Sequence, residues 1–228
     1  MSTVTLNKVC KIFGEGELAV FALRDVDLEI NAGDFVCLSG PSGSGKTTLL
    51  NMIGGLDRAS SGEITVNDQR VDKLNKGDLA EMRLRNIGFV FQAYNLIPVL
   101  SARENVEFVM QLQGIATEVR HQKAIDILKE VGLSGLEDRS PSELSGGQQQ
   151  RVAVARALVS EPALILADEP TANLDSVTAE NLMDLLRSLN DEHGITFVIS
   201  THDKLVMSHA RRLLKMHDGK IVDDIQQR

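Results

Sequence analysis

The feature that most restricts the fold is the segment Gly40–Thr47, which reads GPSGSGKT and fits the pattern G-x-x-x-x-G-K-[ST]. An apolar run at 35–39 (FVCLS) precedes it, and a helical pattern (TTLLNMI) follows from residue 47. Such a loop belongs between a strand and a helix, because successive backbone N–H groups and the helix N-terminus then converge on one anion. The sequence therefore predicts an α/β core that binds the phosphates of a nucleoside triphosphate.

Each polar group of this loop has an expected place around the phosphates. The Lys46 ammonium reaches the β- and γ-phosphates, the Thr47 hydroxyl holds Mg²⁺, and Thr48 contributes at the α-phosphate. The predicted nucleotide contacts are Gly40, Pro41, Ser42, Gly43, Ser44, Gly45, Lys46, Thr47 and Thr48.

Two carboxylates follow a second apolar run, where Asp168 ends ALILAD and Glu169 comes next. A carboxylate at a strand end can orient Mg²⁺, so Asp168 joins Thr47 as a predicted metal ligand. A second carboxylate beside it can polarise the attacking water, and such general-base assistance is worth roughly 10²- to 10⁴-fold in rate. A solvated Asp-Glu turn is the plainer reading, but the phosphate loop upstream favours Glu169 as the base.

Polar residues follow two further apolar runs: Gln92 comes after IGFVF and His202 after ITFVIST. The carboxyl ends of parallel strands converge on the ligand crevice of an α/β sheet. We therefore expect Gln92 and His202 to sense the γ-phosphate or its metal. A lone histidine is more often loop surface, and that reading is kept for His121, His193, His209 and His217.

The rest of the chain alternates between strand-like and helical patterns. Strand-like runs lie at 35–39, 87–91, 163–167, 195–200 and 211–216, with Asp218-Gly219 as a hairpin turn after the last. A helical stripe covers 176–192. Residues 95–160 read as helical, with a capping box at Ser101 and Glu104 and a helix closed by Gly132. The first 35 residues and 62–68 resemble antiparallel strands. We expect one domain over 1–228, with a helical lobe at about 95–160 inserted in the α/β core.

Composition excludes several classes of protein. Lysine and arginine number 24 against 32 aspartates and glutamates, a formal net charge of −8, so nucleic acid is not an expected partner. The two cysteines, Cys10 and Cys37, have no metal or redox spacing, and Cys37 is expected to be buried. No run approaches the roughly 20 apolar residues of a membrane span, and the start lacks a signal-peptide core. We expect a cytoplasmic protein without direct membrane insertion.

The segment LSGGQQQRVAVARAL (144–158) begins a helix in an unusual way. Glycine is about 1 kcal/mol per residue worse than alanine in a helix, yet this one opens on Ser145-Gly146-Gly147. A bare helix start with glycines lets an anion approach the backbone N–H groups closely. A glycine turn that merely precedes a helix is the alternative.

Together these residues resemble the ATP-binding cassette (ABC) ATPases over essentially the whole chain. The matches are Gly40–Thr47 to the Walker A loop, Gln92 to the Q-loop, 144–148 to the signature, Asp168 and Glu169 to Walker B and its catalytic glutamate, 172–175 (ANLD) to the D-loop, and His202 to the switch histidine. The resemblance implies an α/β fold: a P-loop NTPase core with a RecA-like mixed sheet, an N-terminal antiparallel β-subdomain and an inserted helical subdomain.

The resemblance also implies how the site works. Two copies pair head to tail around ATP and Mg²⁺, so the helix start of one chain caps the γ-phosphate that Lys46 of the other holds. ATP closes this dimer and hydrolysis opens it. Catalytic roles fall to Glu169, His202, Lys46 and Gln92, metal binding to Thr47, Gln92 and Asp168, and further nucleotide contacts to Ser145, Gly146, Gly147, Gln148 and Asp175. Phe13 matches the aromatic that stacks on adenine, usually a tyrosine; ordinary core packing of Phe13 is the alternative.

The stretches at 89–108 and 167–175 are similar to one branch of the family, the lipoprotein-release and macrolide-exporter type, which includes the cell-division ATPase. In that branch two ATPase chains sit beneath transmembrane permease subunits and drive a mechanical stroke. The location implied is peripheral, on the cytoplasmic face of the inner membrane. The alternative is an ATPase that signals through a membrane partner to cell-wall enzymes. A socket for the permease is implied at Tyr94, Leu96, Ile97 and Val99, although each could instead pack inside the helical lobe.

Overall fold

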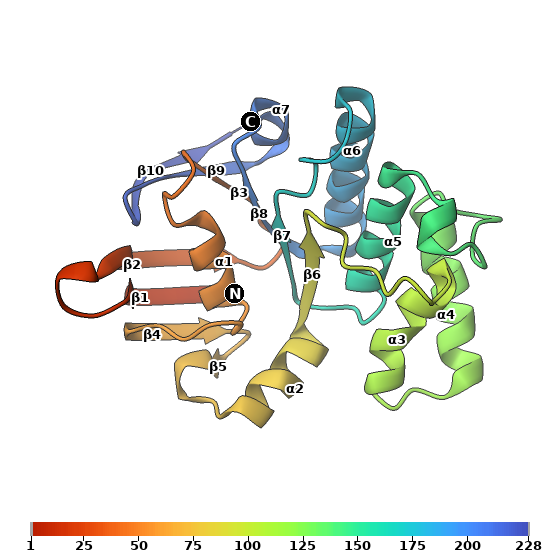
Figure 1. The fold of residues 1–228 in the computed structure, drawn as a ribbon, viewed down its shortest axis with the longest axis horizontal. Helices are drawn as coiled ribbons and strands as arrows, with labels where there is room; N and C mark the ends of the chain where they lie inside the picture. Colours follow the sequence, from red (N-terminus) through yellow and green to blue (C-terminus); the bar gives the residue numbers. More distant parts are fainter. Residues whose placement is uncertain (1, 228) are drawn as a thin grey trace.

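Two β-sheets and a layer of helices make up the fold of the computed structural model, which describes residues 2–227 (Figure 1). The larger sheet has six strands in the order β10-β9-β3-β8-β7-β6. Their bounds are β3 Phe35–Ser39, β6 Ile87–Phe91, β7 Leu164–Asp168, β8 Thr196–Thr201, β9 Arg212–His217 and β10 Lys220–Gln226. All run parallel except β10, which pairs antiparallel with β9. The five strands predicted from apolar runs are confirmed, and each lies within one residue of its predicted position.

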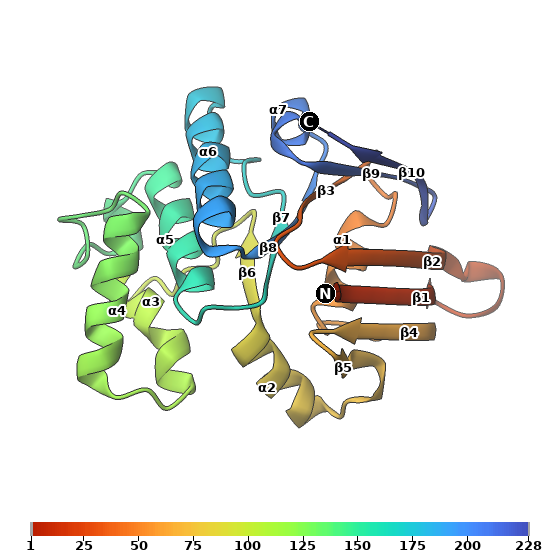
Figure 2. The ribbon, with the colours of Figure 1, turned by 180° about the vertical axis from the view of Figure 1, so that it is seen from behind.

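The smaller sheet is antiparallel, as predicted, with the order β2-β1-β4-β5. Its strands are β1 Ser2–Phe13, β2 Val20–Asn31, β4 Ser61–Val66 and β5 Gln69–Arg70. The β1–β2 hairpin projects from the molecule on the side opposite α3, α4 and α5, which end the molecule on the other side (Figures 1 and 2).

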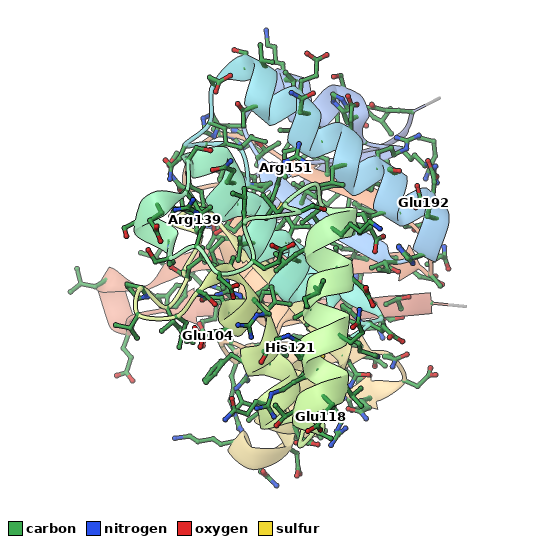
Figure 3. All side chains as sticks on the ribbon, turned by 90° about the vertical axis from the view of Figure 1, so that its right-hand side faces the viewer. Glu104, Glu118, His121, Arg139, Arg151 and Glu192 are labelled. Atoms are coloured by element: carbon green, nitrogen blue, oxygen red, sulfur yellow. The ribbon has the colours of Figure 1, made fainter. Side chains whose placement is uncertain are left out.

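No strand interrupts residues 92–163, where three helices gather beside the large sheet. They are α3 Ala102–Leu112, α4 Thr117–Glu130 and α5 Gly146–Leu158. The capping box of Ser101 and Glu104 is present at the start of α3, and Gly132, at φ 77°, follows the end of α4. Figure 3 looks onto this side, with Glu104 at the start of α3, His121 on α4 and Arg151 on α5.

The remaining helices are α1 Lys46–Ile53, α2 Lys76–Asn86, α6 Ser176–His193 and α7 Lys204–His209, with single 3-10 turns at Gly16–Leu18, Val71–Lys73 and Pro141–Glu143. The helices α2 and α7 are not expected from the sequence. Only Leu79 and Met82 of α2 are buried, so its apolar stripe is too short to register as a helical period. Helix α7 has only six residues and one buried side chain, Val206, so it shows no helical period either.

The large sheet separates two hydrophobic cores. One face packs with α3, α4, α5 and α6, through residues such as Val90, Ile165 and Phe197. The other packs with α1 and the small sheet, through residues such as Leu38 and Leu166. Helices α1 and α5 therefore lie on opposite faces of the same sheet, as Figures 1 and 2 also show.

Two smaller expectations are also met. Asp218 and Gly219 join β9 to β10 with φ values of 46° and 75°, a turn in which both central residues are left-handed. Cys37 is buried in β3, and burial raises the pKa of its thiol to about 12, which leaves it unreactive. Within residues 2–227, none of the helices combines the length and apolar character that a membrane crossing requires.

Candidate functional site

The loop Gly40–Gly45 leaves β3 and runs directly into α1. Two of its glycines are fixed by close approach of the backbone. A Cβ on Gly40 (φ 154°) would lie 2.3 Å from the Met216 carbonyl oxygen, and one on Gly45 (φ 102°) would lie 2.6 Å from that of Ala22. The loop is thus wedged between β2 and the C-terminal hairpin, and Gly219 N–H also donates to the Ser44 carbonyl at 3.0 Å.

The polar groups of this loop suit an anion. The Lys46 side chain is buried, and its Nζ donates to the carbonyl oxygens of Gly40 at 2.8 Å and Pro41 at 3.1 Å, which places the ammonium over the loop. Helix α1 starts at Gly45 without a side-chain cap, so its first N–H groups are available. Ser44 Oγ is buried and has no hydrogen-bond partner among residues 2–227. These groups fit the phosphates of a nucleotide.

The strand register brings the predicted polar residues to one edge of the sheet. Phe91 of β6 lies opposite Asp168 of β7, which lies opposite Ser200 of β8. Gln92, Glu169 and His202 therefore leave the sheet at nearly the same level, as predicted from the strand ends.

Asp168 and Thr47 form the part of the site that suits a divalent cation. Thr47 Oγ1 donates to Asp168 Oδ1 at 3.1 Å, and the Ser200 hydroxyl donates to the same carboxylate oxygen. A hydroxyl and a carboxylate are the hard oxygen ligands that Mg²⁺ prefers. The residues present therefore fit Mg²⁺ beside the phosphate loop.

Glu169 is held by its backbone and by both carboxylate oxygens. Its backbone adopts φ 48°, a left-handed conformation uncommon for a residue with a side chain, and its N–H donates to the Ser200 carbonyl at 3.0 Å. Thr201 Oγ1 donates to Oε2 at 3.2 Å, and His202 Nδ1 lies 2.8 Å from Oε1. The carboxylate is mostly buried, whereas the His202 side chain is 71% exposed. Glu169 and His202 thus act as a hydrogen-bonded pair, with the histidine facing outward.

The start of α5 differs in one respect from the bare helix start expected from the sequence. It carries a capping box: Ser145 Oγ accepts from Gln148 N–H at 3.3 Å, and Gln148 Oε1 accepts from Ser145 N–H at 2.9 Å. The serine and glutamine therefore satisfy two N–H groups. Those of Gly146 and Gly147 have no hydrogen-bond partner within the described residues.

Packing gives the two glycines of α5 a second reason to be glycine. A Cβ on Gly147 would lie 2.4 Å from Thr178 Cγ2, and one on Gly146 would lie 2.9 Å from Tyr94 Oη. Packing inside the chain thus also favours glycine at these positions, and its presence does not by itself establish contact with an anion.

Two predicted residues lie outside the group at the sheet edge. The Phe13 ring at the end of β1 is 46% exposed, and Lys11 Nζ lies over the ring, 4.7 Å from its centroid. Asp175 caps α6: its Oδ1 accepts from the N–H groups of Val177 and Thr178. The Thr178 hydroxyl bond lowers the pKa of the Asp175 carboxyl, so this group is ionised at neutral pH.

Sequence reasoning missed the contacts that hold the loop after Gln92. Asn173 Nδ2 donates to the Gln92 carbonyl at 2.9 Å, so the 172–175 segment is tied to this loop. Arg156 of α5 donates to the carbonyls of Tyr94 and Asn95, two residues with left-handed backbones.

The fold and this site define the class of the protein, a nucleotide-binding P-loop ATPase. The model of the ABC transporter family matches residues 23–172, two thirds of the chain. The chain belongs to the ABC transporter family, and it is an ABC ATP-binding cassette.

Relatives and solved structures match over nearly the whole chain. It is 44% identical over 226 residues to the macrolide export ATP-binding/permease protein MacB of Mannheimia succiniciproducens. The aligned residues make up 99% of this chain and 35% of that protein. The chain spans about a third of the length of that relative. It is 45% identical over 225 residues to the ABC transporter ATP-binding protein MJ0796 of Methanocaldococcus jannaschii, covering 94% of that protein.

The dimeric structure of a post-hydrolysis state of MJ0796 bound to ADP and Pi superposes with a TM-score of 0.90 at 43% identity, covering 99% of each chain. A dimeric structure of the MJ0796 cassette matches with the same TM-score and identity. The α/β fold class and the resemblance to the macrolide-exporter branch are thereby confirmed.

Proposed function

We propose that the whole chain, 1–228, works as one ABC ATPase domain that hydrolyses ATP in a head-to-tail homodimer and drives a transmembrane permease. The observation that carries the dimer is the position of two helix starts with unpartnered N–H groups on opposite faces of one sheet. The Lys46 loop belongs to the α1 face, and the Ser145-Gly146-Gly147 start belongs to the α5 face. Because the sheet lies between them, each element needs a second copy to complete a nucleotide site. The dimeric MJ0796 cassette supports this arrangement.

Hydrolysis would use the groups at the edge of the large sheet. Mg²⁺, held by Thr47, Asp168 and Gln92, would supply positive charge against the phosphate oxygens. Glu169 accepts a proton from water as the water oxygen attacks the γ-phosphorus and the bond to the ADP oxygen breaks. His202 holds the Glu169 carboxylate in place at 2.8 Å. Lys46 offsets charge on the β- and γ-oxygens. Cleavage of the bond to the γ-phosphorus leaves ADP and phosphate as the products.

The other proposed contacts surround the same nucleotide. Phe13 stacks on adenine with the exposed part of its ring. From the second copy come Ser145, Gly146, Gly147, Gln148 and Asp175, of which the two glycine N–H groups are best placed to reach phosphate oxygens.

The permease would dock in a groove of about 550 Å³ between α2, β6, α3 and α5. Its lining is mainly apolar and includes Phe89, Phe91 and Leu112, the last 59% exposed. The loop after Gln92 forms one wall through Asn95. The four residues expected at a permease socket, Tyr94, Leu96, Ile97 and Val99, do not line this groove. Val99 is 87% exposed, whereas Leu96 packs against the core of the helical side. The permease portion in the name of the relative MacB supports a permease as the occupant.

This partner would place the protein on the cytoplasmic face of the cell membrane without insertion of its own helices. An export or mechanotransmission role is the form of coupling that the macrolide-export relative supports. No nucleic acid takes part.

Dimer formation is tested with Glu169→Gln, which keeps the shape of the base and removes its proton acceptor. With Mg-ATP, this variant should run as a dimer on a sizing column with light scattering. Glu169→Gln combined with Lys46→Ala is the matched control and should remain a monomer. A monomeric Glu169→Gln chain at saturating Mg-ATP would overturn the head-to-tail proposal.

Permease docking is tested by affinity capture of the tagged chain from gently solubilised native membranes. A few-span permease with a large outer domain should be recovered, and Leu112→Asp in the groove should abolish its recovery. Val119→Asp on α4, a position 50% exposed outside the groove, is the matched control and should retain it. Recovery of cell-division or cell-wall proteins would instead support the signalling role. Recovery from the soluble fraction alone, without a membrane partner, would contradict both.

A further inference from the structure

Gln150 is a fully buried amide in the middle of α5, with 0% of its surface exposed. Its Nε2 donates to the carbonyl oxygen of Pro170 at 2.7 Å, and its Oε1 has no partner among residues 2–227. A buried amide oxygen without a donor is less favourable than an apolar side chain of the same shape. Packing alone therefore does not explain a glutamine here, and the bond to Pro170 is what the side chain provides.

The Pro170 carbonyl is one peptide away from Glu169, the proposed base. The left-handed backbone of Glu169 is a strained conformation, and such conformations persist only where the surroundings hold them. Two bonds flank it: Glu169 N–H donates to the Ser200 carbonyl on one side, and the Pro170 carbonyl accepts from Gln150 on the other. The proline ring also fixes its own φ, so the bond from Gln150 helps to hold the Pro170 peptide, together with a bond from Ala172 N–H to the Glu169 carbonyl at 3.2 Å.

The same helix carries the segment that is proposed to meet a neighbour's nucleotide. Gln150 lies four residues after Gly146, one helical turn along α5. A shift of α5 as it engages the second nucleotide therefore moves the Gln150 amide, and with it the Pro170 carbonyl and the turn at Glu169. The Gln150 amide, the Pro170 carbonyl and Glu169 belong to one chain. The nucleotide that α5 of this chain meets is bound by the other chain, whereas Glu169 acts on the nucleotide bound by its own chain.

We propose that Gln150 is a positioning residue that couples the two ATP sites of the dimer. It passes the engagement of α5 with the nucleotide bound by one chain to the glutamate that acts on the nucleotide bound by the other. This inference rests on the proposed head-to-tail dimer and on Glu169 as the base.

The test is Gln150→Met, a side chain of similar length and shape that cannot donate to Pro170. We expect kcat for ATP hydrolysis to fall about tenfold, because a misplaced base slows the chemical step. The affinity for ATP, measured on the same variant with a fluorescent ATP analogue, should stay within about twofold of the unchanged chain, since ground-state contacts are intact. The Hill coefficient for ATP should fall toward 1, because each site then works alone.

Asn190 supplies a matched control. It is a second buried amide, 2% exposed, with Nδ2 donating to the carbonyls of Gly33 and Ile195 and with an unpartnered Oδ1, but it lies on α6 away from the site. Asn190→Leu should lower Tm and leave kcat and the Hill coefficient unchanged. If Gln150 has only a structural role, Gln150→Met should likewise lower Tm and leave kcat and the Hill coefficient unchanged.

A second variant keeps the inference testable if Gln150→Met folds poorly. Gln150→Glu retains a donor to Pro170 while its carboxyl is protonated, and burial raises the pKa of such a carboxyl. Its kcat relative to the unchanged chain should therefore be higher at about pH 6 than at about pH 9, as ionisation removes the donor. A ratio that does not vary with pH would count against the bond as the cause.

The outcomes separate this inference from the proposed function. A Gln150→Met chain with unchanged kcat, or with lower kcat and an unchanged Hill coefficient, overturns the coupling role. Persistence of hydrolysis in Glu169→Gln instead overturns the assignment of the base, whatever Gln150→Met does.

Discussion

Gly147→Ala separates the two reasons for a glycine at the start of α5. The added Cβ would lie 2.4 Å from Thr178 Cγ2, about 1 Å inside ordinary van der Waals contact, so Thr178 or the helix must move. Overpacking of this kind costs roughly 1–3 kcal/mol, and alanine returns at most about 1 kcal/mol of helix propensity. A clash near the upper end of that range leaves a net loss of about 2 kcal/mol, which lowers Tm by about 4–8 °C in a chain of this size.

The compensating change is Thr178→Ser, which removes Cγ2 and keeps the hydroxyl that donates to Asp175 Oδ2 at 2.6 Å. In Gly147→Ala/Thr178→Ser the Tm should rise at least to that of Thr178→Ser alone, measured by thermal denaturation followed by circular dichroism. The ATPase rate, measured by phosphate release, should stay low, because the Cβ still separates the helix start from a neighbour's phosphate.

Two results would refute this reasoning at different points. An unchanged Tm in Gly147→Ala alone would mean that the contact with Thr178 relaxes freely and that packing does not require the glycine. Full recovery of both Tm and ATPase in the double variant would mean that packing is the whole reason, and Gly147 would then have no role in approaching a nucleotide.

Three further predictions concern the rest of the chain. A hydrogen bond from Arg70 lowers the pKa of Asp72 to about 2 from its ordinary 3.8, so its stabilisation is present above pH 4 and is lost as the pH falls through 2. Asp72→Asn should lower Tm at pH 7 and flatten the acid loss of Tm; an equally steep loss would contradict this. Phe13→Ala should weaken ATP binding about tenfold in a fluorescent-nucleotide titration, whereas Phe13→Tyr should preserve it, since stacking needs only the π-face. Asn173→Ala should reduce the ATPase rate a few-fold by releasing the carbonyl of Gln92, and a rate equal to that of the unchanged chain would show that the tie is dispensable.

The sequence predicted the strands of the large sheet well because these strands are buried on both faces. A run such as 164–168 must be short and apolar throughout, and the polar residue after it marks where the strand ends. The same logic predicts Asp168, Glu169 and His202 at one edge of the sheet, where the structure has them. Helix α2 lacked such a pattern because only two of its side chains are buried.

The contacts that position the site could not be read from the sequence. Asn173 and Gln150 both donate to main-chain carbonyls, 81 and 20 residues away. Because every residue has a main-chain carbonyl, the residue type of the acceptor does not identify it as the partner. The left-handed backbone of Glu169 is likewise a product of tertiary contacts rather than of local propensity. The close approach of Thr178 to Gly147 could not be predicted from the sequence either, because these residues lie on two different helices, α5 and α6, that pack together only in the folded chain.

The position of the Lys46 loop and the Ser145 helix start on opposite faces of the large sheet has a consequence for genetic complementation. If each nucleotide site takes the Lys46 loop from one chain and the Ser145 helix start from the other, a chain defective at Lys46 and a chain defective at Ser145 are each inactive as homodimers. A mixed dimer of the two collects both defects in one site and leaves the other site intact. Two non-functional alleles should therefore complement each other in one cell, whereas two alleles that damage the same face should not.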